Sequence, residues 1–69
     1  MQLSARNQWK GVIKHISEGM VEAEVTVELA PGVEAVSVIT KSSVQGMGLA
    51  VGQQVYVVVK SSDVMIGKP

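Results

Sequence analysis

Apolar and polar residues alternate most regularly over residues 20–29 of the chain. A repeat of two residues predicts a β-strand with one buried face and one solvated face. Here the buried face would be apolar and the solvated face mainly acidic. The apolar positions are Val21, Ala23, Val25, Val27 and Leu29, and the polar positions are Glu22, Glu24, Thr26 and Glu28.

Stretches rich in β-branched residues predict further strands on either side. Residues 9–18 would form a strand with mixed faces, followed by a turn at residues 17–19. Residues 33–40 follow Ala30-Pro31-Gly32, which is typical of a tight turn, so they are expected to complete a hairpin. Residues 55–59 are apolar or aromatic throughout, which predicts a strand covered on both faces.

A short helix is expected over residues 42–49, where the strand pattern stops. The signals are a serine cap, two apolar residues three positions apart and a final glycine. They are supplied by Ser42 or Ser43, by Val44 and Met47, and by Gly48.

Residues 64–66 would add a last short strand. The fold class is therefore expected to be all-β, an OB-like five-stranded Greek-key barrel with one short helix after the third strand.

The length of 69 residues predicts a single domain over residues 1–69. A chain of this size buries only about 60% of its unfolded surface, so one copy alone is marginally stable. It has no cysteine for a disulfide, and a single histidine disfavours a structural zinc site. Since 46% of the residues are hydrophobic, self-association is expected.

The balance of charge argues against several classes of protein. Six cationic and six anionic residues give a net charge of zero, and Trp9 and Tyr56 are the only aromatic residues. Nucleic-acid-binding proteins are usually basic, and single-strand binders need aromatic stacking platforms. His15 belongs to no recognisable catalytic arrangement, which disfavours an enzyme. No apolar run approaches about 18 residues and no signal peptide is evident, so we expect no membrane span and a cytoplasmic location.

Three short polar stretches contain hydroxyls and cations but no acid: residues 4–8, 40–43 and 60–62. A pocket built from them would offer hydrogen-bond donors and positive charge only. Such a lining suits a small oxyanion that has no proton of its own to donate, for example molybdate, tungstate or sulfate. No metal atom would be ligated directly by the protein.

Each stretch also has a purely structural interpretation when it is taken alone. Ser4 can cap a turn, and Lys60 can be a strand-end lysine whose stem covers apolar surface. Ser42 and Ser43 can be helix caps with no ligand. From the residues alone, both interpretations remain open.

The sequence resembles the molbindin (Mop) family along nearly its whole length. Four segments give the resemblance, and the first and last are the most specific. They are residues 4–11 (SARNQWKG), 19–25 (GMVEAEV), 38–44 (VITKSSV) and 59–67 (VKSSDVMIG). The chain departs from the family at residues 45–48, where glycines replace stronger helix formers.

The resemblance implies an OB-like fold in a homohexamer, a trimer of dimers with strands exchanged between subunits. It implies cytoplasmic binding of molybdate, and often tungstate, for storage or homeostasis, with no organic cofactor. The site would use residues of one subunit, Ser4, Ala5, Arg6, Lys60 and Ser61, with Thr40 and Ser43 of its neighbour. A second oxyanion site is expected at Gly19, Met20 and Val21. The alternatives are an oligonucleotide-binding OB module and a purely structural oligomerisation domain.

Overall fold

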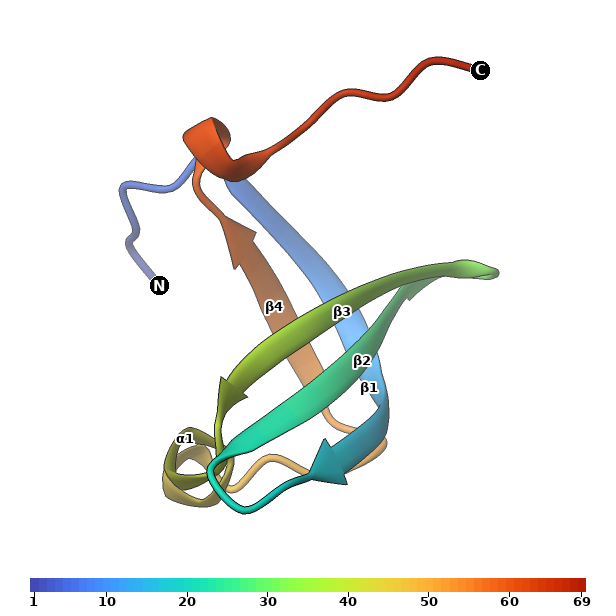
Figure 1. The fold of residues 1–69 in the computed structure, drawn as a ribbon. Coiled ribbons are helices and arrows are strands. Elements are labelled where there is room, and N and C mark those ends of the chain that lie inside the picture. Colours follow the sequence, from blue (N-terminus) through green and yellow to red (C-terminus); the bar gives the residue numbers. More distant parts are fainter.

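The computed structural model describes all 69 residues, which form four strands, one α-helix and one 3₁₀ turn. The elements are β1 (Asn7–Glu18), β2 (Glu22–Ala30), β3 (Val33–Thr40), α1 (Lys41–Met47), β4 (Gln54–Val59) and η1 (Ser61–Asp63). The strands form one antiparallel sheet in the order β3-β2-β1-β4, which curls strongly on itself (Figure 1). Because β4 returns to lie beside β1 after the β1-β2-β3 meander, the topology is a Greek key. The all-β, OB-like prediction is confirmed.

The long strand β1 joins the two halves of the sheet. Its first half pairs with β4, from Asn7 opposite Val59, and its second half pairs with β2 up to Glu18. The register shifts between Ile13 and His15, and such an irregularity bends a strand and increases its twist. The bend lets one strand take part in both halves of a small curled sheet.

Gly11 allows β1 to pass close to β2 near this bend. A Cβ atom at Gly11 would lie 2.5 Å from Val27 Cγ1 and 2.7 Å from the backbone oxygen of Glu28. Both distances are shorter than van der Waals contact, so the close approach requires glycine.

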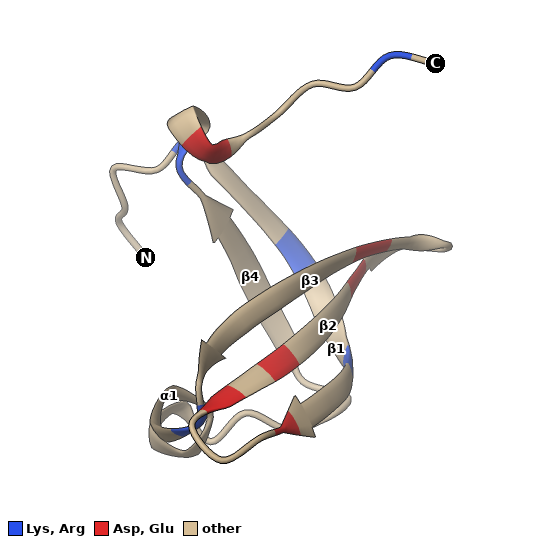
Figure 2. Cartoon of the chain, in the orientation of Figure 1, with Lys and Arg blue, Asp and Glu red and all other residues tan.

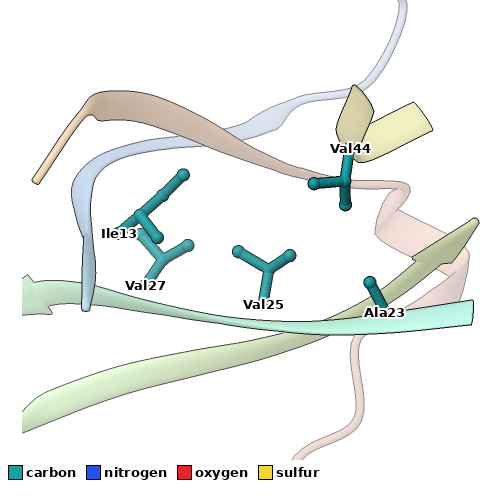
Figure 3. Close-up of a cluster of buried hydrophobic side chains, with 5 residues drawn as sticks. All are labelled: Ile13, Ala23, Val25, Val27 and Val44. Atoms are coloured by element: carbon teal, nitrogen blue, oxygen red, sulfur yellow. The ribbon is translucent and has the colours of Figure 1, made fainter. Parts of the chain in front are cut away.

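The core is small and lies inside the curled sheet under the helix (Figure 3). It contains five buried side chains, Ile13, Ala23, Val25, Val27 and Val44. The alternating pattern therefore predicted the inner face of β2 correctly. Val21 is the exception, since it lies in the bend before β2 and is exposed.

The helix α1 begins one residue earlier than expected, because Thr40 is its N-cap in place of Ser42 or Ser43. The Thr40 hydroxyl accepts a hydrogen bond of 3.0 Å from the Ser43 N–H. Gly48 ends the helix with φ of 62°, as predicted. The expected apolar side is only half right, since Val44 is buried whereas Met47 is exposed.

Three predictions about the strands are wrong. Residues 64–66 form no strand, and the chain is extended there, with Met65 and Ile66 91% and 92% exposed. β4 is not covered on both faces, since Tyr56 and Val58 remain exposed. The turn before β2 lies at residues 19–21, because β1 continues to Glu18.

Much apolar surface stays outside this core. Sixteen large hydrophobic side chains are exposed in the single chain. Ten of them lie on β3, on β4 or near the termini, and the others lie on β1, in the bend before β2, at the end of α1 and in the loop before β4. The buried core contains only five side chains, so more large hydrophobic side chains are exposed than buried. No helix is long and apolar enough to cross a lipid bilayer.

Candidate functional site

The structure brings two of the three polar stretches together in one pocket. The cavity has a volume of about 300 Å³ and lies beside the 3₁₀ turn η1, where the N-terminal segment runs past the end of β4 (Figure 1). Its lining residues are Ser4, Ala5, Arg6, Lys60, Ser61 and Ser62. Five of these six were expected at an oxyanion site, and Ser62 was not, although it belongs to the same polar stretch.

The pairing of β1 with β4 explains why segments more than fifty residues apart meet here. Asn7 is opposite Val59 and Gln8 is opposite Val58. In an antiparallel pair this register leads Arg6 toward Lys60 as the two strands end. The Asn7 side chain strengthens the junction, since its Nδ2 donates to the Val59 oxygen at 3.3 Å.

The pocket offers donors and positive charge. It contains the Arg6 guanidinium, the Lys60 ammonium and three serine hydroxyls, and no carboxylate lines it. The backbone N–H groups of Ser4, Ala5, Arg6 and Lys60 make no hydrogen bond within the chain. Ser61 and Ser62 begin η1, so their N–H groups have no acceptor within that turn. The lining therefore suits an anion that accepts hydrogen bonds on every side.

Carboxylates are concentrated elsewhere in the molecule. Figure 2 shows the acidic residues of β2, β3 and the end of β1 away from η1, the turn that contributes to the pocket lining. Asp63 is the exception, since it lies in η1 immediately after the lining residues. Its backbone N–H donates to the Lys60 oxygen at 2.9 Å, which closes the turn.

Thr40 and Ser43 lie outside this pocket. They belong to the start of α1, at the opposite end of the sheet from η1 (Figure 1). Thr40 donates its hydroxyl proton to Ser43 Oγ at 2.8 Å, and Ser42 Oγ lies 3.2 Å from the Thr40 hydroxyl. Within one chain Thr40 caps the helix, and neither hydroxyl lines the pocket.

The expected second site corresponds to the bend between β1 and β2. The Gly19 N–H is occupied, since it donates to the Glu22 oxygen at 2.8 Å. The N–H groups of Met20 and Val21 make no hydrogen bond within the chain, and both side chains are exposed. Glu18 and Glu22 flank the bend, and their charge would repel an anion. This bend therefore offers fewer donors than the pocket beside η1.

Comparisons with known proteins agree with this description of the fold. A family model described as TOBE domain matches residues 3–66. Molybdenum-pterin-binding protein 2 of Clostridium pasteurianum is 46% identical over 66 residues, which cover 96% of this chain and 97% of that protein.

Two solved structures resemble the whole chain closely. A molybdate-binding protein from Sporomusa ovata superposes with a TM-score of 0.91 at 32% identity, covering 99% of this chain and all of that one. ModG, described as a cytoplasmic molybdate-binding protein and solved with molybdate bound, superposes with a TM-score of 0.93 at 43% identity. That match covers all of this chain and 49% of ModG.

Proposed function

Because the chain belongs to the TOBE-domain family, among the molybdenum-pterin-binding (Mop) proteins, we propose that it binds molybdate reversibly and without catalysis. The observation that supports this most is the pocket beside η1. Its lining combines two cations, three hydroxyls and unpaired peptide N–H groups with no carboxylate. Tungstate has the same shape and charge, so the same donors are proposed to bind it.

The bound dianion would replace water in this pocket. Ser4, Ala5, Arg6, Lys60 and Ser61 are the proposed ligands from one chain, and Arg6 and Lys60 balance its charge. Hydrogen bonds to charged groups contribute roughly 1.5–3 kcal/mol each, so several of them exceed the cost of association. Phosphate fits less well, since at neutral pH it has a proton that needs an acceptor, and the pocket lining has no carboxylate to accept it.

A second copy of the chain is proposed to complete the site. The pocket is largely open in the single chain, and Thr40 and Ser43 at the far end of the sheet would approach it from that copy. The sixteen exposed hydrophobic side chains support assembly, because a small monomer rarely leaves so much apolar surface in water. We propose a homohexamer of single-domain subunits over residues 1–69, with a weaker second oxyanion site at Gly19, Met20 and Val21. Cytoplasmic storage or buffering of the oxyanion is the proposed role.

Equilibrium dialysis tests the proposal directly. The purified protein is dialysed against sodium molybdate, with equimolar sulfate or phosphate as competitor, and bound molybdenum is measured by elemental mass spectrometry. We expect saturable binding that neither competitor abolishes, together with a solution mass above that of one chain. Binding of no molybdenum by a well-folded oligomer would instead support a purely structural oligomerisation domain.

A further inference from the structure

The wall of the pocket formed by Ser4, Ala5 and Arg6 is held by few interactions. These residues precede β1, and none of them takes part in a backbone hydrogen bond. Ser4 and Arg6 are exposed, and Ala5 is only half-buried. Neither strand pairing nor deep burial therefore fixes the segment in place.

One side chain does hold this wall. Gln8 Nε2 donates a hydrogen bond of 2.9 Å to the Ala5 oxygen, which folds the segment back over the start of β1. It is the only hydrogen bond to Ser4, Ala5 or Arg6 in the chain. The Gln8 backbone is meanwhile fixed by its pairing with Val58 in β4. The Gln8 amide thus connects the sheet to the segment that lines the pocket.

The geometry of the peptide group gives this hydrogen bond a direct effect on the site. The peptide between Ala5 and Arg6 is trans, so its N–H points opposite to its oxygen. When Gln8 holds the Ala5 oxygen, it also fixes the direction of the Arg6 N–H. Without that bond, rotation of this peptide would let the donor turn away from a bound anion.

We propose that Gln8 is a positioning residue, which keeps the Ser4–Arg6 wall in the conformation that binds an oxyanion without touching the ligand itself. This inference rests on the proposed function, since it assigns Gln8 to the same site. The apparent dissociation constant rises in inverse proportion to the fraction of molecules in the competent conformation. Loss of one ordinary hydrogen bond therefore predicts an affinity about three- to tenfold lower.

Gln8→Met tests this, because methionine has nearly the shape of glutamine but no donor. The exposed Gln54, which makes no side-chain hydrogen bond and lies at the other end of β4, gives the control Gln54→Met. Titration calorimetry with sodium molybdate is expected to show the three- to tenfold loss for Gln8→Met only. Both variants should stay folded by circular dichroism and keep the wild-type solution mass. Unchanged affinity in Gln8→Met would overturn the proposal.

Proteolysis gives a second measurement that needs no ligand. Arg6 is the only arginine in the chain, so an arginine-specific protease can cut only between Arg6 and Asn7. We expect Gln8→Met to be cut several-fold faster than wild type. Gln8→Lys should restore resistance to the protease, because its ammonium can reach the same oxygen. This comparison is made without oxyanions, since the added positive charge would attract them. Equal cutting of Gln8→Met and wild type would show that Gln8 does not hold the segment.

The two measurements separate this inference from the proposed function. If wild-type protein binds no molybdate, the proposed function fails, while the protease comparison still decides whether Gln8 holds the wall. If wild-type protein binds molybdate and Gln8→Met binds equally well, only the role of Gln8 is wrong.

Discussion

At the scale of single residues, Lys60 is one of the two cations that line the proposed site. It lies in the pocket with Arg6, and no acidic residue lines that pocket. We expect Lys60→Ala to lower molybdate affinity at least tenfold, because a hydrogen bond to a charged group contributes about 1.5–3 kcal/mol. Its exposed position predicts an unchanged fold. Titration calorimetry measures the affinity, and circular dichroism checks the fold.

Lys68→Ala is the matched control for Lys60→Ala. It removes the same charge from the C-terminal segment, which extends away from the pocket (Figure 2). Affinity should therefore stay near that of wild type. An equal loss of affinity in both variants would mean that the net charge of the protein controls binding, and that a local contact of Lys60 does not.

Gly11 tests a packing argument at the same scale. A Cβ atom here would meet the Glu28 backbone oxygen at 2.7 Å, and a backbone atom cannot move aside as a flexible side chain can. Overpacking of this kind costs about 1–3 kcal/mol, so Gly11→Ala is expected to lower the free energy of unfolding by that amount. Urea denaturation at one fixed protein concentration measures it.

Gly46→Ala provides the contrast in the same experiment. Gly46 lies inside α1, and a Cβ atom added there would meet no other atom within 4 Å outside the helix backbone. Alanine is favoured over glycine in a helix by about 1 kcal/mol. We therefore expect this variant to be slightly more stable than wild type. If both alanine variants lost stability equally, close packing would not explain the requirement at Gly11.

At the scale of elements, the helix α1 depends on one hydroxyl. Thr40 caps it, and no acidic residue in the first turn or basic residue in the last turn adds support. Loss of such a cap costs about 1 kcal/mol, which corresponds to roughly 4–8 °C in the melting temperature of a domain this size. Thr40→Ala should show that decrease in ligand-free protein by calorimetry. Ser42→Ala should change it little, since Ser42 does not bind the helix N–H groups.

The elements also show which parts of the fold were predictable from the sequence. Local signals predicted the β2–β3 hairpin well, because alternation and the Ala30–Gly32 turn act over neighbouring residues. The prediction of a fifth strand at residues 64–66 was wrong, because β-branched residues form a strand only where the edge of a sheet pairs with them. Within one chain, this segment pairs with neither edge strand of the sheet, β3 or β4.

The candidate site was predictable to a similar degree. Residue chemistry identified three donor-rich stretches, and the family resemblance assigned particular residues within them. Chemistry alone did not say which two stretches meet, because that depends on pairing between β1 and β4, whose contacting residues are about fifty positions apart. The hydrogen bond from Gln8 to Ala5 was missed, since a glutamine at a strand start has many possible partners.

At the scale of the whole molecule, binding and assembly should be linked. If Thr40 and Ser43 of one copy complete the pocket of another, molybdate binds the assembled protein more tightly than the separate chain. Such a ligand stabilises the assembly by about 2.7 kcal/mol per site at one hundred times its dissociation constant. We expect the melting temperature to rise by about 10 °C or more under those conditions. Differential scanning calorimetry with native mass spectrometry measures both quantities.

Sodium sulfate at equal concentration is the control for this linkage, because sulfate is also an unprotonated tetrahedral dianion. Molybdenum oxyanions are larger, so a pocket closed by two chains should distinguish them and sulfate should raise the melting temperature less. An equal rise with both salts would indicate unselective anion binding. Full affinity in a protein that remains monomeric would show that Thr40 and Ser43 of a second copy are not needed. Full affinity in a monomer cannot arise from a site shared between chains, so affinity and solution mass together decide whether a second copy completes the oxyanion site, while the sulfate control decides its selectivity.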